Sequence, residues 1–270
     1  MSEFEYLKVI NGDELGDYDP DHSEAARIFY MKYWGESLSN DFSDYDGKQG
    51  NYRGDTIISF NTIAGCVISL LSIFKENTLI MPPTGYLECQ EDRLRIIMNA
   101  EDLPNCIRTK FELLYYLYHS FANLMPLVAE KGNHNLNTPV KSGFYRDFPD
   151  LFFSDIRNFY LTGKCNKHFL STESKINEEY FKKFGDKASG VGGWIKYVES
   201  NFLEAFFKQD DVQYETPIKL KPDIPIPYRT STANLPQSEK DKQMEKIDLF
   251  LSNAISIINR RAKILSMAEV

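Results

Sequence analysis

Apolar side chains recur at helical spacing over most of the 270-residue chain. In residues 102–126 they surround nearly the whole helix, which is typical of a helix at the centre of a protein. A second long apolar helix is expected from about Asp55 to Phe74. The pattern therefore predicts a mainly α fold of about seven to eight helices. The remaining helices are expected near residues 24–34, 148–162, 174–185, 193–208 and 239–268, whereas 86–98 fits either a helix or a strand.

Residues that begin or end helices sharpen these boundaries. Ser23 is a typical N-cap, and Gly35 ends the helix that follows it. Asp102 is expected to cap the central helix, with Pro104 in its first turn, where a missing N–H costs little. Pro126 is expected to end or kink that helix.

Longer irregular segments separate the helices. The chain opens with an acidic, turn-rich lead over residues 1–22. Residues 129–147 form a polar loop, and five prolines predict an extended strap over 210–238. The C-terminal helix, 239–268, is expected to return across this strap. We predict one irregular helical domain over residues 1–270, with long loops and a Pro-rich strap.

Charge and composition narrow the class of partner. The chain has 31 basic and 39 acidic residues, a net charge of -8, which makes nucleic acid an improbable main partner. The N-terminus lacks a secretory signal, and the longest apolar stretch, 63–74, is too short to span a bilayer. The four cysteines form no CxxC pair. We therefore expect a cytoplasmic protein without a membrane partner. The sequence specifies neither a cofactor nor an oligomeric state.

The segment 53–62 has unusually many polar side chains for the start of an apolar helix. Asp55, Ser59 and Thr62 would share one helical face, since their spacing is i, i+4, i+7. One interpretation is a helix cap with polar bonds between helices. The other is a site for a phosphate or carboxylate at the first-turn N–H groups. The ligand-binding residues of that second interpretation are Arg53, Gly54, Thr56, Ser59 and Asn61.

The central helix supplies a second candidate. Tyr115, His119 and Asn123 are spaced by four and would stack on one face. His119 has an intrinsic pKa near working pH, so it can act as a general base. The alternative is a hydrogen-bonded histidine of the core. Asn137 and Lys141, in the polar loop, would complete the pocket.

Other motifs carry weaker signals. Asp19-Pro20-Asp21-His22 contains possible metal ligands but also suits a helix-entry turn. The CxxH pair Cys165 and His168 lacks a second ligand pair, so we predict no metal site. Arg260 and Arg261 are expected to be surface charges. The sequence has no GxSxG, HExxH, dinucleotide or kinase motif.

Several segments together resemble an uncharacterised bacterial protein family found in mobile-element and host-defence settings. The family brings no established reaction. Where its pattern leads us to expect an Arg-Gly pair after Asn137, this chain offers Lys141. The resemblance is carried by Gly54-Asp55-Thr56-Ile57-Ile58-Ser59-Phe60-Asn61-Thr62, by Asn123-Leu124-Met125-Pro126 and by Gly193-Trp194-Ile195-Lys196-Tyr197-Val198-Glu199-Ser200-Asn201-Phe202-Leu203.

The leading hypothesis is a protein that binds or processes a small phosphorylated or nucleotide-like ligand, as an enzyme or as a sensor. Asp55 and His119 would handle protons. One alternative is a non-catalytic protein-interaction component of a defence or mobile-element system, and another is a nucleic-acid-acting enzyme. Arg53 and Lys141 would supply positive charge for the ligand. The full set of expected ligand-binding residues is Arg53, Gly54, Thr56, Ser59, Asn61, Asn123, Asn137 and Lys141.

Overall fold

A computed structural model of the chain describes residues 2–8, 10, 20–42, 50–74, 86–128, 148–164, 175–221 and 236–268. The expected loop residues Asn137 and Lys141, and the CxxH pair Cys165 and His168, lie outside the described residues.

The mainly helical fold is confirmed, with nine α-helices and a single two-stranded ribbon in the described part of the chain. The strands are β1 (Tyr52–Thr56) and β2 (Leu124–Val128). The residues that the structure describes also form three short 3₁₀ turns, η1 (Pro20–His22), η2 (Phe121–Asn123) and η5 (Glu204–Phe206). The α-helices are α1 (Glu3–Tyr6), α2 (Glu24–Trp34), α3 (Phe60–Phe74), α4 (Tyr86–Met98), α5 (Asn105–Tyr118), α7 (Pro149–Thr162), α8 (Lys175–Lys182), α9 (Val191–Ser200) and α10 (Gln237–Met267).

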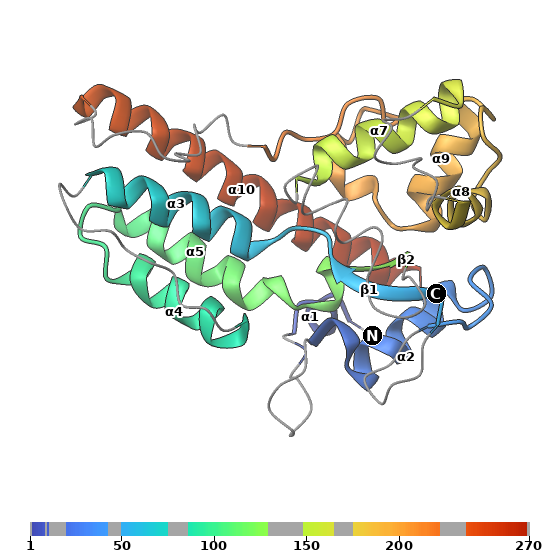
Figure 1. The fold of residues 1–270 in the computed structure, drawn as a ribbon, viewed down its shortest axis with the longest axis horizontal. Coiled ribbons are helices and arrows are strands. Elements are labelled where there is room, and N and C mark those ends of the chain that lie inside the picture. The colour runs from blue at the N-terminus through green and yellow to red at the C-terminus, as the bar shows by residue number, and fades with distance from the viewer. Residues whose placement is uncertain are drawn as a thin grey trace.

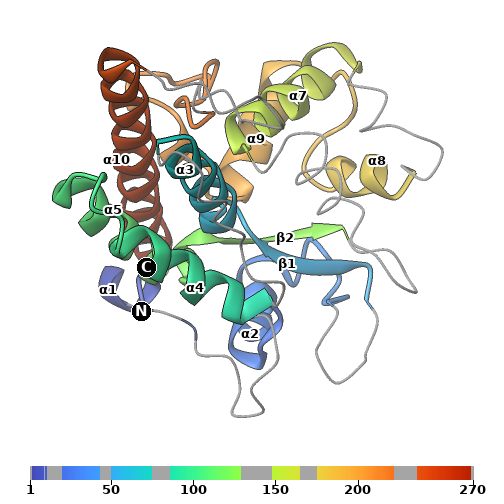
Figure 2. The same cartoon turned by 60° about the vertical axis from the view of Figure 1, so that its left-hand side comes forward.

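The long helix α10 runs past two groups of helices (Figure 1). Its N-terminal half lies beside the group α3, α4 and α5, and α10 packs on α5. The other group is α7, α8 and α9, in which α7 packs on α9. The β1–β2 ribbon lies between this second group and α2 in both views (Figures 1 and 2).

The helix expected from Asp55 is wrong at its start, because residues 52–56 form strand β1 and α3 begins only at Phe60. Burial alternates along β1: Tyr52, Gly54 and Thr56 are buried, and the residues between them are half-buried. This period of two is that of a strand. β1 pairs antiparallel with β2, with Gly54 opposite Pro126.

The central helix is also shorter than expected. It begins after Pro104 rather than at Asp102, and it ends at Tyr118. The chain then makes a turn at His119, passes through η2 and enters β2. Pro126 therefore lies in a strand and does not kink a helix. A two-stranded ribbon has only edge strands, where the missing N–H of proline is tolerated.

Several boundaries are confirmed. Ser23 caps α2, because its Oγ accepts a hydrogen bond from the N–H of Ala26 at 3.2 Å, and α2 ends before Gly35. The C-terminal helix is α10, a helix of 31 residues. The part of the strap that the structure describes, up to residue 221, contains no helix or strand.

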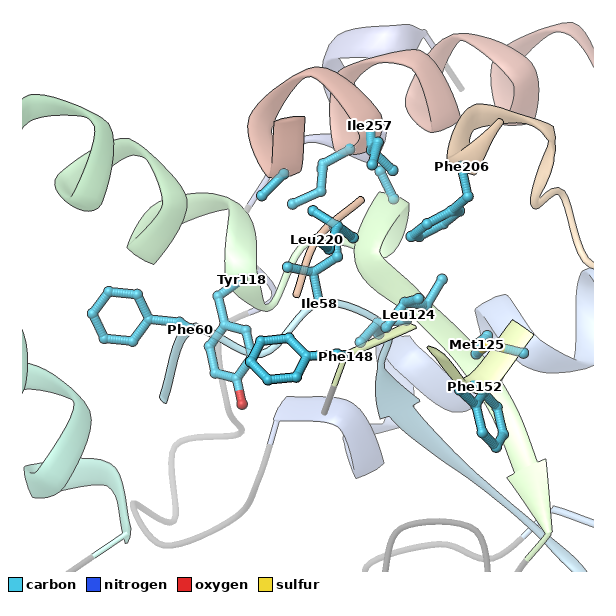
Figure 3. Packing of buried hydrophobic residues seen from close by; sticks show 14 of the residues in the cluster. Ile58, Phe60, Tyr118, Leu124, Met125, Phe148, Phe152, Phe206, Leu220 and Ile257 are labelled. Carbon is cyan, nitrogen blue, oxygen red and sulfur yellow. The ribbon is translucent and has the colours of Figure 1, made fainter. Parts of the chain in front are cut away.

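The core extends from the ribbon to α10. Figure 3 shows Ile58, which follows β1, and Leu124, the first residue of β2, with Leu220 and Ile257 nearby. All four side chains are at most 1% exposed. Within the described residues no helix is long and apolar enough to cross a bilayer.

Arg261 is not a surface charge, contrary to expectation, because it is fully buried in this core. Its guanidinium donates hydrogen bonds to the backbone carbonyls of Ala122 and Leu124, at 2.9 and 2.7 Å, next to β2. It also donates to the carbonyls of Asn201 and Phe202, at 3.2 and 2.9 Å. Burial lowers the pKa of Arg261 to about 9. One side chain thus joins α10, the end of α9 and the ribbon.

Candidate functional site at the end of the ribbon

Asp21 of η1 lies against the end of strand β1. Its Oδ2 accepts a hydrogen bond from the backbone N–H of Thr56 at 3.0 Å. The side chain is buried, with 3% of the residue exposed. Its backbone carbonyl accepts a hydrogen bond from the hydroxyl of Tyr30 at 3.1 Å. These bonds fix the short turn before α2 to the ribbon.

His119 follows α5 and faces the same carboxylate. Its Nε2 lies 3.8 Å from Oδ1 of Asp21, and the imidazole is 4.1 Å from the Tyr118 ring, centroid to centroid. The backbone carbonyl of His119 accepts a hydrogen bond from Ile10 at 3.0 Å. Only 7% of His119 is exposed. The imidazole therefore packs on an aromatic ring and lies near a buried carboxylate.

The environment of His119 favours its neutral form. Burial lowers the pKa of His119 to about 4, and the negative charge of Asp55 only partly offsets this effect. The imidazole is consequently neutral near pH 7, with a ring nitrogen able to accept a proton. A neutral imidazole can accept a proton, and a nearby carboxylate stabilises the imidazolium that forms, although a pKa of about 4 makes this imidazole a weaker base than an exposed histidine.

Strand β1 places a cation beside this group. Arg53 and Asp55 are two residues apart, so their side chains leave the same face of the strand. Both are half-buried, whereas the residues between and beside them are buried. We refer to Asp21, Asp55 and His119 as the His119 cluster; Arg53 is its neighbour on β1.

Two of the expected ligand residues, Gly54 and Asn123, make close contacts within the fold. A Cβ on Gly54 would lie 1.9 Å from the Tyr30 hydroxyl, so glycine is needed for close contact with α2. The amide of Asn123 accepts from the N–H of Ile58 at 3.0 Å and donates to the carbonyls of Ile58 and Tyr118, at 2.9 and 2.8 Å. The buried Asn123 amide is thereby used in bonds to the backbone.

Other polar groups of segment 53–62 also form hydrogen bonds within the protein. Ser59 is the residue before α3, and its Oγ accepts a hydrogen bond from the N–H of Thr62 at 3.3 Å. Ser59 therefore has the N-cap position expected for Asp55. The backbone N–H of Thr56 donates to Asp21, as described above. The carbonyl of Asn61 accepts from Arg93 at 2.9 Å, and its side chain is half-buried.

The expected stack of Tyr115, His119 and Asn123 on one helix is wrong, because α5 ends before His119. Tyr115 remains on α5 and packs edge-on against Phe60, with ring centroids 5.5 Å apart. Of the three, only His119 joins the cluster.

Sequence reasoning missed Asp21 as a partner of His119. The sequence around Asp21 indicates only a metal motif or a helix-entry turn. The contact depends on η1 packing on β1, which no local spacing encodes. Among the described residues, no three His, Cys, Asp or Glu side chains meet in a group suited to a metal ion.

Comparison of the chain with protein-family models, curated proteins and solved structures finds no match. The resemblance to a bacterial defence or mobile-element family therefore stays a prediction.

Proposed function

We propose that the protein binds a small nucleotide-like ligand at the His119 cluster and that His119 accepts a proton from it. The observation that supports this most is the buried, neutral imidazole, which lies 3.8 Å from the Asp21 carboxylate and feels the negative charge of Asp55. Strongly shifted pKa values of this kind are concentrated at functional sites.

Arg53 and Asp55 suggest the class of ligand. The guanidinium is suited to a phosphate, which it binds through two N–H groups. The carboxylate of Asp55 is suited to hydroxyl groups, as acidic residues accept hydrogen bonds from ribose in dinucleotide sites. Along a strand these two positions are about 7 Å apart. A ligand with both a phosphate and sugar hydroxyls satisfies both side chains.

Within the cluster the two carboxylates have different roles. Asp21 is fixed by the N–H of Thr56, so it orients the imidazole and stabilises the imidazolium that forms. Asp55 is half-buried, and we assign it to contact with the ligand. If the protein is an enzyme, His119 removes a proton from a ligand hydroxyl. If it is a sensor, the same contacts serve binding alone.

Thermal-shift measurements with ribonucleoside mono-, di- and triphosphates test this function. At a concentration one hundred times Kd, binding adds about 2.7 kcal/mol to stability, which raises Tm by several degrees. Arg53→Gln and Asp55→Asn should abolish this rise. Arg95→Gln, which changes an exposed arginine on α4, is the matched control and should retain it.

His119→Gln separates binding from chemistry. We expect this variant to keep most of the nucleotide-induced rise in Tm but to lose any turnover of the ligand. Absence of a rise with every nucleotide, or an equal rise in wild type and Arg53→Gln, would overturn the proposal.

We also propose a cytoplasmic location. Cys106 carries an exposed thiol, which persists in a reducing compartment.

A further inference from the structure

A groove is lined by the N-terminal parts of α5 and α10, away from the His119 cluster. It encloses about 640 Å³. α5 and α10 pack directly on each other along this side of the molecule (Figures 1 and 2). His119 follows the opposite, C-terminal end of α5. The groove is therefore a separate surface.

The floor and one wall of the groove are apolar. Ile107 of α5 is buried at the bottom, and Met244 of α10 is partly buried against the core. Leu249 of α10 also lines the groove but is 57% exposed. An exposed leucine beside an apolar floor provides hydrophobic area that a partner can cover.

The rim of the groove is acidic. Asp102, Asp241, Glu245 and Asp248 line it, with Lys240 as the lining cation. Asp248 is matched by Lys110, whose Nζ is 2.6 Å from its Oδ1. Asp102, Asp241 and Glu245 are exposed. The surplus of carboxylates disfavours phosphates, nucleic acids and anionic lipids.

We propose that this groove binds a basic amphipathic α-helix of a partner protein. The apolar face of such a helix covers Met244 and Leu249, as in helix-in-groove recognition. Its lysines or arginines meet Asp241 and Glu245 at the rim, where complementary charge adds specificity and speeds association. The long aliphatic stems of these basic residues also cover apolar surface.

A synthetic peptide of leucine and lysine tests this interaction. The probe is a fluorescein-labelled amphipathic helix of about 18 residues, long enough to form a helix when bound. The matched peptide has glutamate in place of lysine. Fluorescence polarisation with the full-length protein should show saturable binding of the lysine peptide and none of the glutamate peptide.

Two variants test the two kinds of contact. Glu245→Lys and Leu249→Ser should each raise Kd at least about tenfold. Both positions are exposed, so both variants should fold. Asp210→Lys is the control, because it reverses an exposed charge far along the chain from the groove, and it should change Kd less than about twofold.

The reactivity of the Cys106 thiol reports whether peptide is bound in the groove. Its exposed thiol lines the groove, so bound peptide should slow its reaction with a maleimide, measured at Cys106 by mass spectrometry. Failure of the lysine peptide to bind would overturn the proposal. Binding that is equally tight in Leu249→Ser would also overturn the proposal, because it would show that charge attraction alone holds the peptide. If the protein self-associates and Leu249→Ser abolishes this association, the groove binds a second copy of the chain. That result would also overturn the proposal.

Discussion

His119 and Asn123 are four residues apart, yet their surroundings give them different roles. The Asn123 amide is occupied by the backbone of Ile58 and Tyr118. The imidazole of His119 instead faces Asp21 across 3.8 Å. The residue types alone did not separate these roles, because both side chains suit either a ligand or a core hydrogen bond.

Asn123→Ala should destabilise the protein strongly. The change leaves two carbonyls and one N–H without their partner in a buried place, so we expect a loss of about 2–4 kcal/mol in unfolding free energy. Urea unfolding measures it. Asn61→Ala, at a half-buried position, should cost less than about 1 kcal/mol. Equal costs for the two variants would contradict a structural role for Asn123.

The depressed pKa of His119 makes stability depend on pH. Its pKa is about 4 in the folded state and 6.5 as the ordinary value. The unfolded chain therefore binds a proton more readily, and stability falls as pH drops from 6.5 to 4, by up to about 3 kcal/mol. His119→Gln should remove this part of the slope, measured by urea unfolding at several pH values. An unchanged slope would show that the imidazole titrates normally.

At the scale of elements, the polar segment 53–62 divides between a strand and a helix cap. Asp55 and Ser59 are both N-cap residue types, and the sequence alone favoured the earlier one. The strand partner of Asp55 is Met125, far away along the chain. A strand of five residues has only a few alternating positions. Its sequence pattern is therefore weaker than the helical pattern of the apolar segment that follows it.

Gly54 tests the contact between β1 and α2. Gly54→Ala places a Cβ against the ring of Tyr30, so we expect a loss of about 1–3 kcal/mol. Tyr30→Ala removes the obstructing ring. A double-mutant cycle should show that the two changes together cost less than the sum of the single changes. Additive costs would mean that Tyr30 and Gly54 do not limit each other.

At the scale of the whole molecule, helical periodicity predicted the mainly α fold, and the start and end of α2 followed from Ser23 and Gly35. The position of α10 was also predictable, to within two residues at its start. The ribbon and the Asp21–His119 contact could not be predicted from the sequence, because each joins segments that are distant along the chain. The part of the site expected at Asn137 and Lys141 lies outside the described residues.

Arg261 joins these distant segments, so its loss should affect the whole fold. Arg261→Met leaves four carbonyls without their donor, and we expect a loss of about 3–5 kcal/mol. Arg260→Met is the control, because Arg260 donates one hydrogen bond, to the carbonyl of Phe207. Thermal unfolding compares the two. A similar decrease in Tm for both variants would contradict the central role of Arg261.

The central claim is that His119 is a neutral proton acceptor in a nucleotide-like site. NMR of the histidine imidazoles during pH and nucleotide titrations measures this directly, with His119→Gln to assign the signal among the four histidines. We predict a pKa of about 4 for His119 in the free protein and a saturable change of its signal when nucleotide is added. A pKa near 6.5, or a signal that no nucleotide changes, would contradict the claim.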